Sequence, residues 1–352
     1  MPAVAHSVMF KDWFRSEDEF VGLLKALVAA EHRHGRAGAA ERRSGVKLGI
    51  GDDAALLTTH RGRDLILTTD MTIEGVHFTC RLHPPEAVGH RALARSLSDV
   101  AAMGGVPRYA LVSLAITKKV NRSWIATLYR GMQALASRFG VVIVGGDTAL
   151  VPDRIFLDVL VAGEVSQGAA LRRSGARAGD QILVSGRLGL SALGLRWLQR
   201  KVSARRRRER AGAKEAIRAH LYPEPQCALG NFLSSRSLAS AAMDLSDGLS
   251  TDLARLCAAS GVGARLWAAR IPLPGAPAAS ESLPLALHGG EDYQLLFTVP
   301  PRKLARLPLE FRGRPLYAVG EIEAAKGLKL VMPDGEVRGL EPAGWDHLRV
   351  RG

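Results

Sequence analysis

The sequence contains few cysteines, which argues against the folds that disulfides or a structural zinc ion hold together. Three cysteines occur in 352 residues, and Cys80, Cys227 and Cys257 lie far apart with no CxxC pair. An odd count without metal-ligand spacing argues against a disulfide framework and against a structural zinc site. We therefore expect three small buried residues.

Long apolar runs are also missing. Apolar runs such as residues 141–144 have the length of a strand, whereas a membrane-spanning helix needs about 20 apolar residues. Residues 1–15 mix His, Lys, Asp and Arg and lack the continuous apolar core of a secretory signal. These features predict a cytoplasmic protein.

Two common nucleotide signatures are absent or fail. No GxxxxGK[ST] motif occurs, which excludes a P-loop enzyme. Gly49-x-Gly51-x-x-Ala54 fits the looser Rossmann pattern, but its variable positions include Asp52 and Asp53. Two carboxylates would repel a pyrophosphate, and a strand rather than a helix is expected next. We reject a dinucleotide site there.

Charge is unbalanced, with 48 Lys and Arg against 34 Asp and Glu and a net charge of +14. Much of the excess lies in the segment Arg200–Arg210. A nucleic-acid-binding protein is therefore one hypothesis. However, no aromatic residue is interleaved for base stacking, and no helix-turn-helix or finger pattern is present. We interpret the segment as a solvated connection, and expect neither nucleic acid nor membrane as a partner.

Length and hydrophobic content, 47% of 352 residues, predict two domains. We place the boundary at residues 165/166, because a turn-rich segment begins near residue 170. The N-terminal half predicts helices over 17–33, 85–103 and 122–138, and strands over 54–59, 65–69, 72–78, 109–116, 141–144 and 155–164. The C-terminal half predicts helices over 189–201, 213–221, 225–236 and 249–260, and strands over 181–185, 240–244, 262–269, 293–299, 315–321 and 328–332. Both halves mix strands and helices, which indicates two layered α/β domains.

Aspartates in small-residue loops at strand ends are the most informative feature. Each alone has a simpler explanation: Asp247-Gly248 is typical of a turn, and Asp147-Thr148 could cap a helix. Several such places in one chain favour a shared divalent cation, because grouped carboxylates repel one another unless neutralised. Oxygen donors without His or Cys favour magnesium over zinc. The motifs are Gly49-Ile50-Gly51-Asp52-Asp53, Thr68-Thr69-Asp70, Leu97-Ser98-Asp99, Gly145-Gly146-Asp147-Thr148 and Met243-Asp244-Leu245-Ser246-Asp247-Gly248.

A further motif, Gly289-Gly290-Glu291-Asp292-Tyr293, precedes an apolar run. Its glycines admit close backbone approach, and its acidic pair could face a cationic ligand. An ordinary hairpin turn explains the spacing equally well.

Together with Arg173-Ser174-Gly175-Ala176, these motifs occur in an order that resembles the thiamine-monophosphate kinase family. The resemblance covers residues 49–346 and implies a two-domain fold like that of aminoimidazole ribonucleotide synthetase. It implies an N-terminal domain, residues 1–165, that forms a homodimer and binds metal and ATP. It also implies a C-terminal domain, residues 166–352, that completes the nucleotide and substrate site. Arg95-Ser96 departs from the family pattern, which often has a smaller residue followed by Asn.

The resemblance assigns roles to individual residues. The implied magnesium ligands, for several ions, are Asp53, Thr68, Thr69, Asp70, Asp99, Asp147, Asp244 and Asp247, and Asp99, Asp147 and Asp247 are also assigned to catalysis. The implied ATP contacts are Tyr129, Arg173 and Ser246. The implied thiamine-phosphate contacts are His77, Glu291 and Trp345. The thiazolium ring is a permanent cation, so a carboxylate and an indole suit it.

The implied reaction is direct, in-line transfer of a phosphoryl group from ATP to thiamine monophosphate, without a phosphoenzyme. Among relatives, aminoimidazole ribonucleotide synthetase is the runner-up. Selenophosphate synthetase is expected to carry a reactive Cys near its N-terminus, whereas the first cysteine here is Cys80. The hydrogenase-maturation dehydratase ends in a functional Cys, whereas this sequence ends in Arg351-Gly352. A non-catalytic nucleotide-binding relative is disfavoured because every expected acidic position is present.

Overall fold

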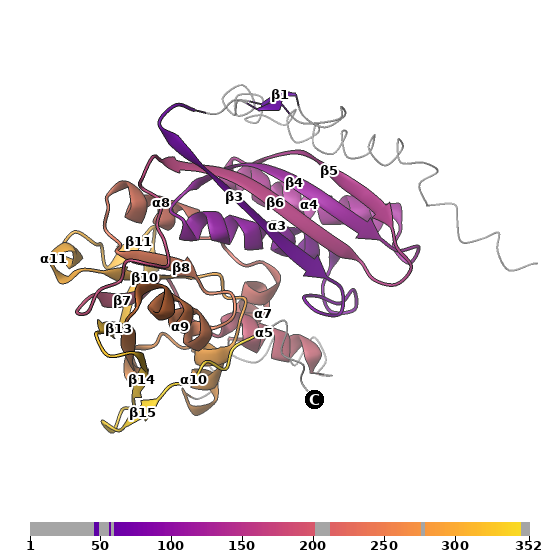
Figure 1. The fold of residues 1–352 in the computed structure, drawn as a ribbon. Helices are drawn as coiled ribbons and strands as arrows, with labels where there is room; N and C mark the ends of the chain where they lie inside the picture. Colours follow the sequence, from indigo (N-terminus) through magenta and orange to yellow (C-terminus); the bar gives the residue numbers. More distant parts are fainter. Residues whose placement is uncertain (1–45, 49–55, 58–59, 201–211, 276–278, 346–352) are drawn as a thin grey trace, which may run out of the picture. The chain divides into compact units, whose positions relative to one another are not determined.

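The computed structural model describes residues 46–48, 56–57, 60–200, 212–275 and 279–345 (Figure 1). The predicted helix over 17–33, Asp53 and most of the Arg200–Arg210 segment lie outside these residues. The chain divides into two compact units. Unit 1 comprises Met1–Arg61, Leu67–Ser96 and Pro107–Ala162, and unit 2 comprises Gly62–Ile66, Leu97–Val106 and Gly163–Gly352.

A four-stranded sheet and two long helices form the first layered element, with strand order β3-β6-β4-β5. The strands are β3 (Arg63–Ile73), β4 (Val106–Ile116), β5 (Val142–Leu150) and β6 (Phe156–Ser166), and the helices α3 (Pro85–Ala102) and α4 (Arg122–Phe139) lie against one face (Figure 1). A short pair, β1 (Val46–Leu48) with β2 (Leu56–Leu57), is antiparallel. The predicted separate strands over 65–69 and 72–78 were wrong. They form one strand that ends at Ile73, and Glu74 and Phe78 make only an isolated bridge.

Helix α4 shows why the sequence forms a helix here. Asn121 caps its N-terminus, with its side chain accepting the Trp124 N–H at 2.9 Å. Gly140 ends it in the left-handed conformation, at φ 68°. Ile125, Leu128 and other residues at helical spacing are buried. The predicted helix over 122–138 is confirmed.

Helices α3 and α4 touch at two glycines. A Cβ atom at Gly89 would lie 1.9 Å from the Leu128 carbonyl oxygen, and one at Gly131 would lie 2.0 Å from the Glu86 carbonyl oxygen. Real Cβ atoms do not approach backbone oxygens this closely, and backbone cannot move aside as a side chain can. The two helices can therefore pack at this distance only because both positions are glycine.

The second layered element is a seven-stranded sheet in unit 2, with strand order β15-β14-β9-β13-β7-β10-β8. The strands are β7 (Gln181–Val184), β8 (Ala241–Asp244), β9 (Gly263–Trp267), β10 (Leu295–Val299), β13 (Tyr317–Glu323), β14 (Gly327–Val331) and β15 (Val337–Gly339). Most neighbours are antiparallel, but β14 and β9 are parallel. A separate hairpin joins β11 (Glu310–Phe311) to β12 (Arg314–Pro315).

The helices of unit 2 are α5 (Leu190–Gln199), α7 (Ala213–Leu221), α8 (Cys227–Ser235), α9 (Leu249–Ser260), α10 (Ala279–His288) and α11 (Pro301–Leu304). The apolar stripe of α9, which includes Leu253 and Leu256, packs into one core with the β7 and β8 residues Ile182 and Met243. The predicted helices over 213–221 and 249–260 are confirmed.

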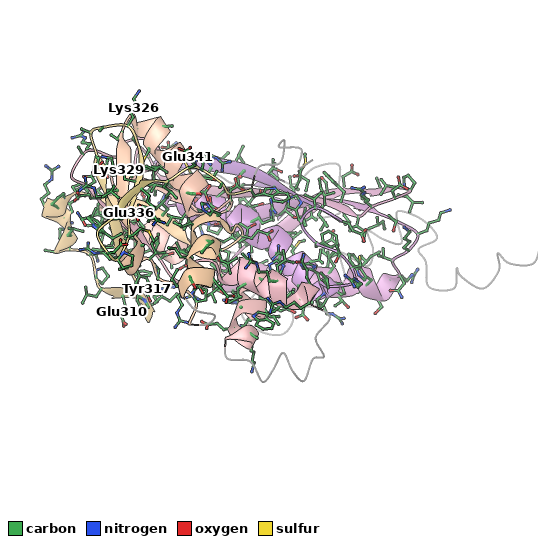
Figure 2. All side chains as sticks on the ribbon, turned by 90° about the horizontal axis from the view of Figure 1, so that it is seen from below. Glu310, Tyr317, Lys326, Lys329, Glu336 and Glu341 are labelled. Carbon is green, nitrogen blue, oxygen red and sulfur yellow. The ribbon has the colours of Figure 1, made fainter. Side chains whose placement is uncertain are left out.

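All three residues of the edge strand β15 are exposed. Charged side chains accompany it, including Glu336 and, on β14, Lys329 (Figure 2). Lys329 Nζ also pairs with Glu323 at 2.9 Å. Charge on an exposed edge discourages pairing with another chain.

All three cysteines are free, and Cys227 and Cys257 are buried as expected. Cys80 is exposed, so the prediction of burial was wrong for this residue. Within the described residues, every helix is too short or too polar to cross a membrane.

Helix α5 begins without a side-chain cap of its own, because its N-cap residue is Gly189. Asp292, far away in sequence, takes that role: its carboxylate accepts the N–H groups of Gly189 at 2.5 Å and of Ser191 at 3.0 Å. Desolvation raises the pKa of Asp292 to about 7, against the opposing effect of these N–H groups.

We expect Gly131→Ala to lower the free energy of unfolding by on the order of 1–3 kcal/mol, because the added methyl group forces α3 and α4 apart. Chemical denaturation measures this. Gly339→Ala is the matched control, since a Cβ there meets nothing within 4 Å. Equal effects of the two substitutions would contradict the close helix contact.

The raised pKa of Asp292 predicts a pH-dependent stability. A carboxyl with a folded pKa near 7 and an unfolded pKa of 3.8 stabilises the fold at low pH, and this contribution is lost as pH rises through 7. Asn resembles the protonated carboxyl but cannot ionise. As the pH rises from 5 to 8, the melting temperature of Asp292→Asn should therefore increase relative to that of the wild type. If the difference between the two melting temperatures stays constant over this range, the N–H groups of Gly189 and Ser191 keep the carboxylate ionised in the folded protein, which would contradict the raised pKa.

Candidate active site

The end of β8 and the turn after it carry the predicted Asp244, Ser246 and Asp247. Asp244 is buried, and Ser98 Oγ on α3 donates to its Oδ2 at 2.8 Å. Ser98 directly precedes Asp99. The structure therefore brings the helix turn that carries Asp99 to the strand end that carries Asp244, although 145 positions separate them in sequence.

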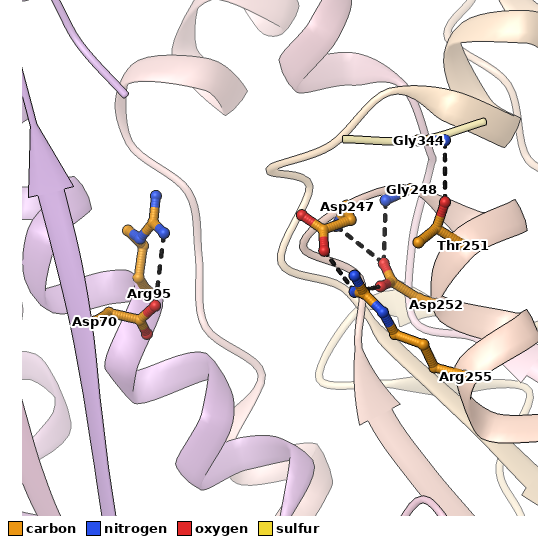
Figure 3. A network of polar contacts seen from close by, with 8 residues as sticks. All are labelled: Asp70, Arg95, Asp247, Gly248, Thr251, Asp252, Arg255 and Gly344. Atoms are coloured by element: carbon orange, nitrogen blue, oxygen red, sulfur yellow. Dashed lines mark hydrogen bonds and ion pairs between the residues drawn. The ribbon is translucent and has the colours of Figure 1, made fainter. Parts of the chain in front are cut away.

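Asp247 is held by a network that starts on α9 (Figure 3). Asp252 is fully buried, and its Oδ2 accepts the N–H groups of Asp247 and Gly248, each at 3.0 Å. Its Oδ1 lies 3.0 Å from Arg255 Nη1, which also pairs with Asp247 Oδ2. Burial raises the pKa of Asp252 to about 7, and the negative charge of Asp247 adds to the effect. Asp252 thus fixes the backbone of Asp247 directly and its side chain through Arg255.

Backbone hydrogen bonds bring two predicted substrate residues to the same turn. Glu291 N–H donates to the Ser246 carbonyl at 2.7 Å, and Trp345 N–H donates to the Asp247 carbonyl at 3.1 Å. Neighbouring glycines permit this approach: a Cβ at Gly344 would lie 2.1 Å from the Asp247 carbonyl oxygen. Two predicted nucleotide or metal residues and two predicted substrate residues therefore meet within unit 2.

Glu291 has an unusual backbone. Its φ is 67°, and Tyr293 two residues later has φ 49°, although neither is glycine. The left-handed region is costly for such residues and persists where surrounding contacts hold it. Here the Tyr293 N–H donates to the Leu245 carbonyl at 2.9 Å. Trp345 leaves 38% of its surface exposed.

In unit 1, Asp70 and His77 lie at the end of β3 and just after it. Arg95 Nη2 on α3 lies 3.5 Å from Asp70 Oδ1 (Figure 3). His77 Nδ1 accepts the Ile73 N–H at 3.0 Å. Because Nδ1 is the acceptor in this bond, the neutral ring carries its proton on Nε2, which makes that atom a donor.

The predicted ligands of unit 1 do not all face one way. Along β3, Thr68 and Asp70 alternate with Thr69, which belongs to the opposite, exposed side, where its hydroxyl donates to Asp158 at 2.7 Å. Asp147 pairs in register with Ser113, so its side chain shares that exposed side. Asp147 lies inside β5, which excludes the helix cap considered for it.

The predicted ATP contacts have different surroundings. Arg173 is exposed in a loop, and its carbonyl accepts a hydrogen bond from Ser260 on α9 at 3.0 Å. Tyr129 is 3% exposed on α4, and burial raises the pKa of its hydroxyl. Tyr129 therefore presents little surface to a ligand.

The donor set fits magnesium in kind, because Asp70, Asp99, Asp147, Asp244 and Asp247 offer hard oxygen atoms. Within the described residues, no three His, Cys, Asp or Glu side chains are grouped closely enough to hold one ion together. The predicted ligand Asp53 lies outside those residues.

The sequence patterns did not single out four residues that contact the predicted aspartates and hold them in place. Ser98 lies within a recognised motif and Arg95 lies close to it in sequence. Asp252 and Arg255 lie on α9, a few residues after Asp247. The i, i+3 spacing of the last two on a predicted helix was the available signal, since it places both on one face.

Family models and known proteins agree on one relationship. Residues 51–165 match the N-terminal domain of AIR synthase related proteins, and residues 177–333 match the C-terminal domain. Thiamine-monophosphate kinase of Bacillus subtilis strain 168 is 34% identical over 317 residues, which cover 87% of this chain and 95% of that protein. The Escherichia coli K12 enzyme of the same name is 38% identical over 312 residues, covering 86% and 92%.

Solved structures agree. Thiamine-monophosphate kinase from Stenotrophomonas maltophilia K279a superposes with a TM-score of 0.75 at 34% identity, over 85% of this chain and 94% of that one. AaThiL complexed with AMPPCP and TMP gives a TM-score of 0.70 at 31% identity, over 83% and 89%. Hydrogenase maturation protein HypE, at 20% identity and a TM-score of 0.69, shares the fold. The chain therefore belongs to the AIR synthase related proteins and, among them, to the thiamine-monophosphate kinase family.

Proposed function

We propose that this protein transfers the terminal phosphoryl group of ATP to the phosphate of thiamine monophosphate and so produces thiamine diphosphate. The relatives named thiamine-monophosphate kinase, and the neighbour that binds AMPPCP and TMP, support this reaction. One observation carries it in this chain: the Ser246-Asp247 turn receives the backbone N–H groups of Glu291 and Trp345. The groups assigned to the donor and to the acceptor thereby share one turn. The cytoplasm, where ATP is available, is the proposed location.

Magnesium is the proposed metal. The residues that would hold it are Asp53, Thr68, Thr69, Asp70, Asp99, Asp147, Asp244 and Asp247. Bound magnesium would neutralise the phosphates, since two unit charges about 4 Å apart repel by about 4 kcal/mol at an effective dielectric of about 20. Asp99, Asp147 and Asp247 have the proposed catalytic role, because they would place that charge at the transferred group.

The remaining residues bind and orient. Glu291 offers a carboxylate to the thiazolium cation, and the half-exposed indole of Trp345 offers a π face. His77 is the third proposed contact of thiamine monophosphate. Arg173 and the Ser246 hydroxyl are the proposed ATP contacts, with Tyr129 the third. The acceptor oxygen is already anionic near neutral pH, so direct transfer needs no strong general base and no phosphoenzyme.

A homodimer formed through residues 1–165 is the proposed assembly, with residues 166–352 completing the nucleotide and substrate site. The four-stranded sheet supports this proposal. Its face opposite α3 and α4 exposes Leu67 by 61%, Met71 by 55% and Leu111 by 36%. Large apolar side chains from separate strands on one open sheet face are typical of an interface with a second copy.

Conversion of Asp247 to Asn should reduce kcat/KM at least about 100-fold, because a neutral amide is a poor ligand for a hard cation. Asp70→Asn should act in the same direction. The assay follows thiamine diphosphate formed from ATP, magnesium and thiamine monophosphate. Asp334→Asn, at an exposed turn, is the matched control and should retain wild-type activity. Absence of product from folded wild-type protein would contradict the proposed reaction.

Conversion of Leu67 and Leu111 together to Glu should convert a dimer into a monomer, because burial of unpaired carboxylates at the interface is costly. Light scattering coupled to size-exclusion chromatography measures the mass. Leu309→Glu is the control, since Leu309 is 90% exposed but belongs to unit 2. A monomeric wild type, or a double variant that remains dimeric, would contradict the proposed interface.

A further inference from the structure

We propose that His220, at the end of α7, is a positioning residue that holds the Glu291 carboxylate in its substrate-binding orientation. The inference rests on the proposed function, because it assumes that Glu291 contacts the thiazolium ring. His220 belongs to none of the acidic motifs, and it is 1% exposed, so it acts through its neighbours rather than by touching substrate.

The contacts of His220 form a closed ring of four residues within unit 2. Its Nδ1 lies 3.0 Å from Ser191 Oγ and 3.9 Å from Glu291 Oε2. The Ser191 N–H, in turn, donates to Asp292, the residue that follows Glu291. Hydrogen bonds thus attach the loop to the start of α5 through Asp292, and the Glu291 carboxylate lies next to the imidazole at the end of α7.

The position of His220 matters because of the backbone conformation of Glu291. With φ at 67°, Glu291 occupies a region that few side chains adopt, and its direction is set by the surrounding structure. Its N–H is fixed on the Ser246 carbonyl, which settles the backbone but leaves the side-chain torsions free. The imidazole of His220, 3.9 Å from Oε2, limits the torsions open to the Glu291 side chain, so less rotational entropy is lost when substrate binds.

Helix packing places His220 at this position. A Cβ at Gly194 on α5 would lie 2.1 Å from the Ala216 carbonyl oxygen and 2.8 Å from His220 Cβ. Only glycine at 194 lets α7 approach closely enough for the imidazole to reach Ser191 and Glu291. Leu193 and Trp197 of α5 belong to a buried apolar cluster that also includes residues of α7. This cluster holds the two helices together and so fixes the position of His220.

The test is a set of variants assayed with ATP and thiamine monophosphate, together with thermal melting. His220→Leu should raise the KM of thiamine monophosphate about tenfold, with kcat and the KM of ATP changed by less than about threefold. His220→Asn should recover most of the loss, because its amide reaches the position of Nδ1. His220→Gln, whose amide reaches the position of Nε2, should not. Leu193→Ala controls for loosened packing, and should lower the melting temperature without raising that KM.

A double-mutant cycle with Glu291→Gln separates this inference from the proposed function. In that background His220→Leu should have little further effect on the KM. A raised KM for Glu291→Gln with a normal KM for His220→Leu would overturn the inference and leave the proposed function standing, as would additive effects. A normal KM for Glu291→Gln would overturn the substrate role of Glu291, and the inference with it.

Discussion

The turn at Ser246-Asp247 is the constraint on which the candidate site depends. Its two carbonyls accept the N–H groups of Glu291 and Trp345, and the N–H groups of Asp247 and Gly248 donate to Asp252. These bonds join the turn to three separate parts of unit 2: the loop of Glu291, the segment of Trp345, and Asp252 on α9. Because the backbone polar groups are satisfied by protein, the turn keeps its shape without help from solvent. Precise placement of this kind is what phosphoryl transfer requires of a protein, since most of its catalysis is positioning and charge.

Acidic residues in both units are accompanied by arginine. Arg95 lies beside Asp70 in unit 1, and Arg255 pairs with Asp247 and the buried Asp252 in unit 2. Neutralisation by arginine allows a carboxylate to remain in a partly buried loop without strong repulsion from its neighbours. A cation that reaches Asp247 therefore meets a carboxylate already oriented by a guanidinium group.

The sequence predicted elements with strong local signals and missed those determined by context. Helix α4 has a capping Asn121, apolar periodicity and a terminal Gly140, and it was predicted to within a residue at its C-terminus. Helix α10 was missed because Pro284 interrupts its pattern. Among the proposed site residues, the motifs pointed to Asp247 and Glu291, but the bond that joins their loops uses backbone atoms. Backbone groups are the same in every residue, so no side-chain pattern could reveal that contact. Tertiary packing also decided where β3 ends and which strand face each threonine occupies.

The left-handed conformation of Glu291 has a consequence for evolution and for engineering. Glycine adopts this conformation at no steric cost, so a search for greater thermal stability alone would favour its appearance at 291. Such a change would remove the carboxylate assigned to the cationic ring. Position 291 therefore sets heat resistance against the ligand recognition proposed for Glu291.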